Sequence, residues 1–201
     1  MLKRNYKVCL PPRQSVFLWG ARQTGKSSFL KTSFKNSVCY DLLDSGELVR
    51  LTKNPRLLRE QVLDLSKSAL DHPIIIDEIQ KVPELLNEVH WLIENTQACF
   101  ILCGSSARKL KTQSTNLLGG RAWVYHFFPL TSEEIPHFDL LRALQHGLLP
   151  KHYLSDPRYI QDNLEAYVDT YLIDEIRNEG LVRNLAGFHV FLMLLVYLMQ
   201  K

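Results

Sequence analysis

A glycine-rich segment between an apolar run and a helical pattern contains the residues best suited to chemistry. It reads Gly20-Ala21-Arg22-Gln23-Thr24-Gly25-Lys26-Ser27-Ser28 and fits G-x-x-x-x-G-K-[ST]. Glycines let backbone N–H groups converge on phosphate oxygens, and the N-terminus of the following helix favours an anion. Lys26 is expected to reach the β- and γ-phosphates of a nucleotide, and the Ser27 hydroxyl to bind Mg²⁺.

Two adjacent acids, Asp77 and Glu78, follow a second apolar run over residues 74–76. An acid at the carboxyl end of a buried strand suits a carboxylate that holds Mg²⁺ through water, so Asp77 joins Ser27 as an expected metal-site residue. Glu78 is the natural general base for a water that attacks the γ-phosphate. About 50 residues separate the acids from the glycine-rich loop, which leaves room for one intervening strand. Such a strand is typical of the additional-strand ATPases rather than of kinases and GTPases, and no N-K-x-D guanine-binding motif occurs.

Three further polar residues are candidates for the same site. Ser105 follows a third apolar run within Gly-Ser-Ser, where it is expected to sense or orient the attacking water. Arg121 follows a glycine pair, and we expect it near the γ-phosphate as a charge-stabilising arginine, a role that contributes about 10³ to 10⁵ in rate. A surface arginine that fixes the loop is the alternative for Arg121, and Arg22 could instead act on a neighbouring subunit's nucleotide. Asp44 is expected to cap a helix rather than to bind a ligand.

The elements that position these residues follow from the hydrophobic pattern. Short apolar runs alternate with segments of helical periodicity, which predicts an α/β fold with a parallel sheet. Strands are expected at 15–19, 37–41, 74–77, 98–103 and 122–128, and helices at 26–34, after Pro55 and from Pro83. Beyond Pro129 only helices are expected, over about 132–146, 160–178 and 185–199, with a capping box formed by Thr131 and Glu134. We therefore divide the chain into an α/β core, residues 1–130, and a helical appendage, residues 131–201.

Composition limits the class of protein but not its partners. The chain has 201 residues, 46% of them hydrophobic and 22% charged, which excludes wholesale disorder. A net charge of +3 argues for neither nucleic acid nor membrane, although the basic loop 108–111 leaves nucleic acid open. The apolar stretch 188–199 is too short to span a membrane and no signal peptide is recognisable, so a cytoplasmic protein is expected. The four cysteines are expected to be small core residues in a reducing compartment.

In their order, these motifs resemble the AAA+-like ATPases of the AAA_14 type, which are usually followed by a DUF4143 domain. The residues that support the resemblance are 20–27, 76–85, 102–106, 120–121, 129–134 and 147–150. It implies a P-loop NTPase fold of the ASCE class with a five-stranded parallel sheet, binding of ATP and Mg²⁺, and ATP hydrolysis in an AAA+-like switch or motor. Residues 167–176 resemble the start of the region that follows in relatives, so the chain is expected to be truncated. Cys103 stands where relatives often have Thr, which leaves a side-chain role there in doubt.

Three functions remain open on this basis. The leading one is an ATPase in which Glu78 activates water and hydrolysis changes the order of residues 108–120. The second is a nucleotide-dependent binding module, or a truncated remnant with negligible turnover, and the third is a small-molecule kinase. The terminal apolar run, residues 188–198, covers most of a helix circumference, so we expect it to be buried against the appendage, a second copy or a protein partner.

Overall fold

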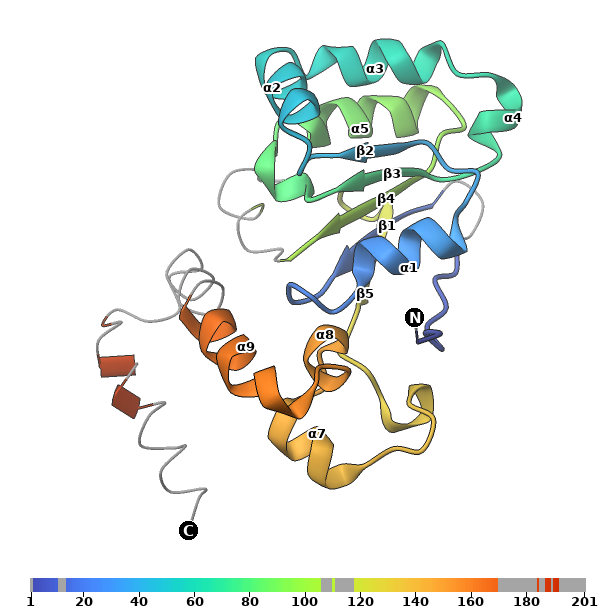
Figure 1. Ribbon diagram of the computed structural model, residues 1–201. Coiled ribbons are helices and arrows are strands. Elements are labelled where there is room, and N and C mark those ends of the chain that lie inside the picture. The colour runs from blue at the N-terminus through green and yellow to red at the C-terminus, as the bar shows by residue number, and fades with distance from the viewer. Residues whose placement is uncertain are drawn as a thin grey trace.

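The computed structural model describes residues 2–10, 14–105, 110, 118–169, 184, 187–188 and 190–191. Five strands form its central sheet, in the order β2-β3-β4-β1-β5 (Figure 1). They are β1 (Ser15–Trp19), β2 (Cys39–Asp41), β3 (Ile74–Asp77), β4 (Phe100–Gly104) and β5 (Ala122–His126). Every pairing is parallel, so the carboxyl ends of all strands meet at one edge. The strand in the gap between the loop and the acids is β2, which lies at the edge of the sheet beside β3. The strand that separates β1 from β3 is β4, which follows the acids in the chain.

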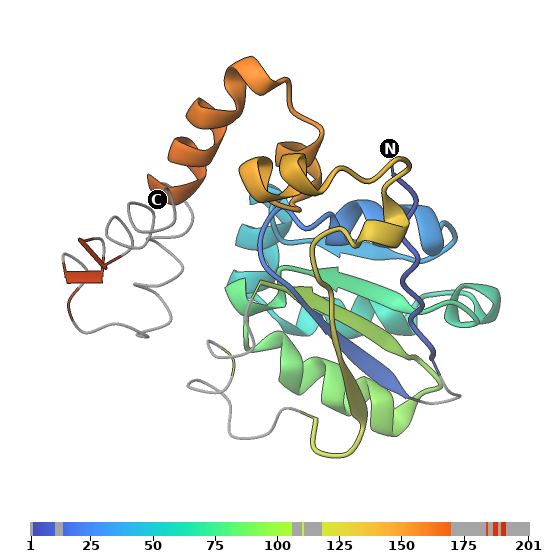
Figure 2. The same cartoon turned by 90° about the horizontal axis from the view of Figure 1, so that it is seen from below.

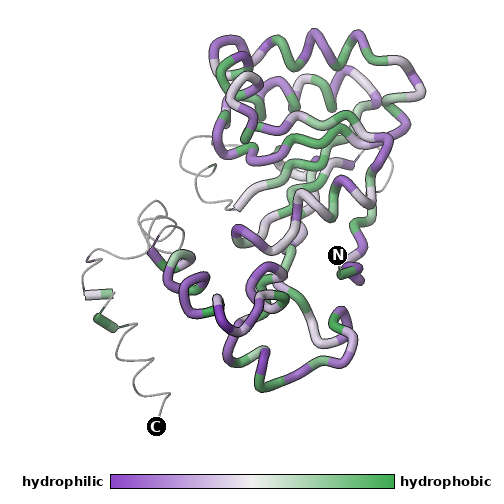
Figure 3. Tube along the Cα trace, in the orientation of Figure 1, coloured by the Kyte–Doolittle hydropathy of each residue, from purple (hydrophilic) through white to green (hydrophobic). Residues whose placement is uncertain are grey.

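Helices cover both faces of this sheet, which explains the uninterrupted apolar runs of the central strands. One face packs against α2 (Ser45–Lys53), α3 (Arg56–Leu63) and α5 (Leu85–Asn95), and the other against α1 (Lys26–Ser33) (Figure 1). Side chains of β1 alternate accordingly, with Phe17 and Trp19 in the first cluster and Val16 and Leu18 in the second. In Figure 3 the hydrophobic colour runs along the central strands. Short α4 (Lys67–Leu70) and η1 (Ile79–Lys81) complete the core.

Beyond β5 the described chain forms only short helices. They are η2 (Ser132–Glu134), α7 (Leu140–His146), α8 (Pro150–Tyr153), η3 (Pro157–Tyr159) and α9 (Ile160–Tyr167). Figure 2 shows α9 extending away from the core and from the N-terminus. Leu130, Ile135 and Tyr153 form a small cluster of their own, against which Leu2 of the N-terminal segment packs.

Several local expectations can be compared with these elements. Asp44 caps α2 by accepting a hydrogen bond from Glu47 N at 2.9 Å, as expected, and the capping box of Thr131 and Glu134 is present. A continuous helix over 132–146 is wrong, because Ile135 is extended before Pro136 and the helix resumes only at Leu140. The loop 108–120 lies outside the described residues apart from Leu110 and 118–120, as do residues 170–178 and most of 185–199.

The cysteines divide between core and surface. All four are free thiols, and only Cys103 is buried, whereas Cys9 and Cys39 are exposed. The expectation of core cysteines is therefore confirmed for Cys103 and wrong for Cys9 and Cys39. Within the described part of the chain, no helix combines the length and apolar character needed to cross a membrane.

Candidate functional site at the carboxyl edge of the sheet

The glycine-rich loop joins β1 to α1 at the carboxyl edge of the sheet. Gly25 occupies the N-cap of α1 with φ 93°, in the left-handed region that glycine adopts without strain. Gln23 is also left-handed, with φ 63°, and Thr24 Oγ1 donates to the Ala21 carbonyl at 2.8 Å. These conformations fold the loop back over the first turn of α1. The N–H groups of that turn therefore lie where the sequence predicted phosphate binding.

Lys26 is a buried cation within this loop, with 6% of its surface exposed. Its Nζ donates to the Gly20 carbonyl and to the Ala21 carbonyl, the latter at 2.9 Å. Both acceptors are neutral, so they satisfy the hydrogen bonds of the ammonium group without neutralising its charge. A cation in this environment favours an anionic ligand.

Ser27 and Asp77 connect the loop to the end of β3. Ser27 Oγ donates to Asp77 Oδ2 at 2.6 Å, and the Asp77 side chain is buried. A hydroxyl and a carboxylate side by side form a hard-oxygen donor set of the kind that Mg²⁺ accepts, with phosphate oxygens and water as its other ligands. Among the described residues, no group of three or more His, Cys, Asp or Glu could hold a metal by itself. The donor set thus fits a metal that arrives with a nucleotide.

Glu78 and Ser105 approach each other through Gln80, to which the sequence analysis gave no role in the site. The Glu78 backbone is left-handed, with φ 59° and ψ 41°, an uncommon conformation for a non-glycine residue. The Gln80 side-chain Nε2 donates to the Glu78 carboxylate and, at 3.2 Å, to Ser105 Oγ. Ser105 follows β4, which lies between the strands that precede the loop and the acids. The sequence signal for Gln80 is its place within residues 76–85, directly after the acids, among the residues that support the family resemblance.

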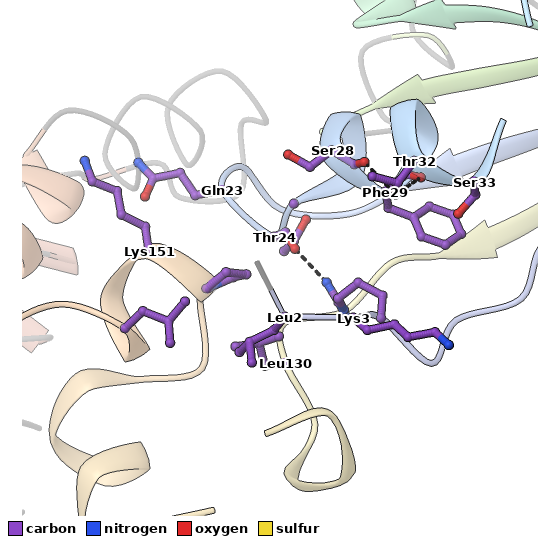
Figure 4. A pocket seen from close by; sticks show the side chains of 14 residues that line it. Leu2, Lys3, Gln23, Thr24, Ser28, Phe29, Thr32, Ser33, Leu130 and Lys151 are labelled. Atoms are coloured by element: carbon purple, nitrogen blue, oxygen red, sulfur yellow. Dashed lines mark hydrogen bonds between the residues drawn. The ribbon is translucent and has the colours of Figure 1, made fainter. Parts of the chain in front are cut away.

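Two cavities flank the loop. The first, of about 440 Å³, is polar and is lined by Arg22, Gln23, Gly25, Lys26, Ser27, Ser28, Leu43, Glu78 and Lys81. The second, of about 740 Å³, lies beside the N-terminal segment and α8 (Figure 4). Its lining includes the apolar side chains Leu2, Leu130, Pro150 and Leu154. Gln23, Gly25 and Ser28 line both cavities, so the loop forms their common wall.

Arg121 lies away from this site, which corrects the expectation that it reaches the γ-phosphate. Its carbonyl accepts from Ser15 N, at the start of β1, whereas the loop follows Trp19 at the other end. A strand of this length separates the two edges by about 15 Å. The Arg121 side chain instead pairs with Glu94 near the end of α5. The alternative of a surface arginine agrees with this position.

Arg4, which the sequence analysis did not single out, connects the loop to the segment after β5. Its guanidinium donates to the Thr24 carbonyl at 2.7 Å and pairs with Glu134 at 3.0 Å. It also donates to the carbonyls of Phe128 and Pro129 at 2.7 and 3.0 Å. Nothing in the sequence marks this arginine, because its partners lie 20 to 130 residues away.

The carboxylate of Glu134 is buried but accepts several hydrogen bonds. Burial raises its pKa, yet the N–H groups of Thr131 and Asn5 and the Arg4 guanidinium outweigh burial and lower the pKa below its ordinary value. Glu134 is therefore an anion at neutral pH, held between the N-terminal segment and η2.

Cys103 offers no reactive thiolate to the site. Burial, followed by the nearby charge of Asp77, raises the pKa of its thiol well above the ordinary value. The side chain packs in the cluster between the sheet and α1, so it behaves as a small apolar residue.

Comparison with known proteins gives one family match. A family model described as "AAA domain" (AAA_14) matches residues 12–136 of this chain. That range contains the glycine-rich loop, both acids and Ser105. A search of curated proteins finds no match.

Solved structures resemble the chain at low sequence identity. A Walker-type ATPase of Pyrococcus abyssi is 17% identical, with a TM-score of 0.41, 75% of this chain covered and 57% of that chain. Drosophila ORC bound to DNA is 14% identical, with a TM-score of 0.38 and coverage of 94% and 52%. Pif1 helicase in a complex with forked double-stranded DNA is 15% identical, with a TM-score of 0.34 and coverage of 70% and 46%. The chain therefore spans about half the length of these structures.

Proposed function

The chain belongs to the AAA-domain family and so has the fold of a P-loop ATPase. We propose that it binds ATP with Mg²⁺ and hydrolyses the bond between the β- and γ-phosphates. The observation that supports this most directly is the hydrogen bond of 2.6 Å between Ser27 and Asp77. It joins the phosphate-binding loop to the first of the two acids across β4. The general base Glu78 is the next residue along the chain.

The two cavities account for the two halves of a nucleotide. The polar cavity beside Lys26 and Ser27 suits the triphosphate, because it contains a buried cation and the first turn of α1. The larger cavity suits the nucleoside, since apolar side chains such as Leu130 and Pro150 can cover the flat face of a base. Both volumes lie within the usual range for ligand sites, about 300 to 1,000 Å³.

Each polar residue at the edge has a distinct part in the reaction. Lys26 binds phosphate oxygens and stabilises the charge that develops on them. Ser27 and Asp77 would hold Mg²⁺, which when bound neutralises phosphate charge. Glu78 accepts the proton of the attacking water, and Ser105 faces the phosphate from the end of β4.

Two substitutions test this function. Lys26→Ala should abolish binding of a non-hydrolysable ATP analogue in calorimetry with Mg²⁺, because the loop loses its buried cation. Glu78→Gln should retain that binding but lower the rate of phosphate release by at least about 100-fold, since general-base catalysis contributes roughly 10²–10⁴. Lys31→Ala is the matched control, because this lysine lies on the same helix with its side chain 67% exposed. Wild-type turnover in Glu78→Gln would remove Glu78 from the mechanism.

A nucleotide-dependent binding module with negligible turnover is the second candidate. The observation that favours it is a set of large apolar side chains left exposed on β5 and α7, among them Trp123 at 47%, Leu141 at 64% and Leu144 at 74%. Phosphate release measured over a range of protein concentrations separates the two. A rate per chain that rises steeply with concentration indicates an active site completed by a neighbouring copy, whereas no turnover at any concentration favours the binding module.

A further inference from the structure

We propose that Gln80 is a positioning residue for ATP hydrolysis, and that its side-chain amide fixes the Glu78 carboxylate relative to Ser105. This inference rests on the function proposed above and adds to it a residue outside both acidic and glycine-rich motifs. Gln80 does not touch the nucleotide in this scheme. It acts on the reaction only through Glu78 and Ser105.

The geometry of the turn directs Gln80 toward these two partners. The left-handed Glu78 ends β3 abruptly, and η1 begins at the next residue. This brings the Gln80 side chain back across the edge of the sheet toward β4. Both hydrogens of its Nε2 are then used, one on the Glu78 carboxylate and one on Ser105 Oγ.

Gly104 creates the space in which the amide lies. A Cβ at this position would collide with the Gln80 amide oxygen and would lie 2.8 Å from the Trp19 ring. The strand that precedes Ser105 must therefore end in glycine for Gln80 to occupy this slot. Glycine is therefore required at position 104 because any larger residue would occupy the space of the Gln80 amide.

The amide has only one acceptable orientation in this slot. Its oxygen is buried and has no hydrogen-bond partner within the described part of the chain. Burying an acceptor without a partner is unfavourable. Rotating the amide by half a turn would place that oxygen against the Glu78 carboxylate, which repels it, so the nitrogen remains toward Glu78. The Gln80 amide oxygen therefore lacks a hydrogen bond, while the amide nitrogen holds the Glu78 carboxylate.

Both partners keep an atom free for the reaction. Gln80 binds Oε2 of Glu78, which leaves Oε1 of the same carboxylate for a water molecule. Ser105 Oγ accepts from Gln80, so its own hydrogen can point to a phosphate oxygen. One amide thus connects the group that takes the proton with the group that faces the phosphate.

The test removes the amide donor without removing the volume of the side chain. Gln80→Met should lower kcat at least tenfold while the Kd of a non-hydrolysable ATP analogue stays within twofold. In a Glu78→Gln background the same substitution should lower the residual rate by a smaller factor, because only the part of its effect that passes through Ser105 remains. A merely structural role would lower the rate by the same factor in both backgrounds. Gln161→Met is the matched control, since Gln161 donates to Glu165 at 2.8 Å on the exposed surface of α9.

The outcomes distinguish this inference from the function on which it rests. Turnover of Gln80→Met equal to that of the wild type overturns the inference and leaves the ATPase intact. Absence of turnover in the wild type, or full turnover in Glu78→Gln, overturns the proposed hydrolysis and the inference with it. If Gln80→Met does not fold, as judged by circular dichroism, Gln80→Leu decides in its place, because it also removes the donor and is apolar and of similar size.

Discussion

Lys26 holds a positive charge where little water reaches it, and two carbonyl oxygens of its own loop are its hydrogen-bond partners. Binding a phosphate there replaces neutral acceptors by charged ones, and charge-assisted hydrogen bonds are roughly twice as strong. Ser27 and Asp77 hold each other in place through a hydrogen bond of 2.6 Å. The residues proposed to bind the triphosphate are therefore largely preorganised, which lowers the cost of ordering them.

Arg121 provides a prediction at this scale. Arg121→Ala should leave the rate of phosphate release within about twofold, because the side chain pairs with Glu94 at the edge away from the loop. The free energy of unfolding should fall by less than about 1 kcal/mol, since pairs this exposed are worth little. Phosphate-release kinetics and urea denaturation measure the two effects. A loss of 10³ in rate would instead return Arg121 to the site as a charge-stabilising residue.

At the scale of elements, the phosphate loop is supported from outside its own strand and helix. The segment 2–10 lies along the core, where Tyr6 contacts Phe29 of α1 and Phe127, with ring centroids 5.9 and 5.1 Å away. Arg4 of this segment reaches the Thr24 carbonyl and Glu134 of η2. The N-terminal segment thus joins the loop to η2. A change in the loop on nucleotide binding would therefore act on the N-terminal segment and on η2.

Replacing Arg4 tests this connection. Arg4→Met should lower the free energy of unfolding by about 3 kcal/mol, because the Arg4 side chain is 9% and the Glu134 side chain 3% exposed, and a buried charge left without its partner is costly. The affinity for an ATP analogue should also fall, since the loop loses a support. Urea denaturation and calorimetry are the measurements, with Lys7→Met, an exposed position of the same segment, as the control. Stability equal to the control would show that the ion pair contributes nothing.

At the scale of the whole molecule, the α/β core contacts the helices after β5 through a small apolar cluster and a few hydrogen bonds. Leu130, Ile135 and Tyr153 bury little apolar area compared with the two clusters that flank the sheet. Glu134 accepts hydrogen bonds from both sides of this junction, from Asn5 N at 2.7 Å and from Thr131 N at 3.0 Å. The junction is therefore sensitive to the charge on one carboxylate.

Acid should weaken the junction in a defined direction. The pKa of Glu134 lies below its ordinary value of 4.5, so its contribution to stability is complete above that value and is lost as the pH falls through the lowered pKa. Urea denaturation of the wild type should show this loss as the pH falls below 4.5 toward the lowered pKa. Glu134→Gln should be less stable at neutral pH and should lose less on acidification. The control Glu133→Gln, an exposed neighbour, should follow the wild type at every pH.

The sequence by itself determined the local elements and the motifs they contain. The strands, α1, the cap at Asp44 and the capping box at Thr131 depend on neighbours along the chain, so residue types and periodicity predict them. The placement of the loop opposite Asp77 was also predictable, because parallel strands bring their carboxyl ends to one edge. The break at Pro136 was readable too, yet the helical periodicity around it masked the signal.

The tertiary structure alone decided which distant side chains meet. The position of Arg121 is the exception, because it precedes β5 and the same parallel arrangement places it a strand length from the loop. Arg4 and Gln80 bind atoms contributed by other elements, and a glycine at position 104 matters because of the amide that occupies its space. Such contacts depend on the packing of the sheet edge in three dimensions, and no spacing along the chain encodes them.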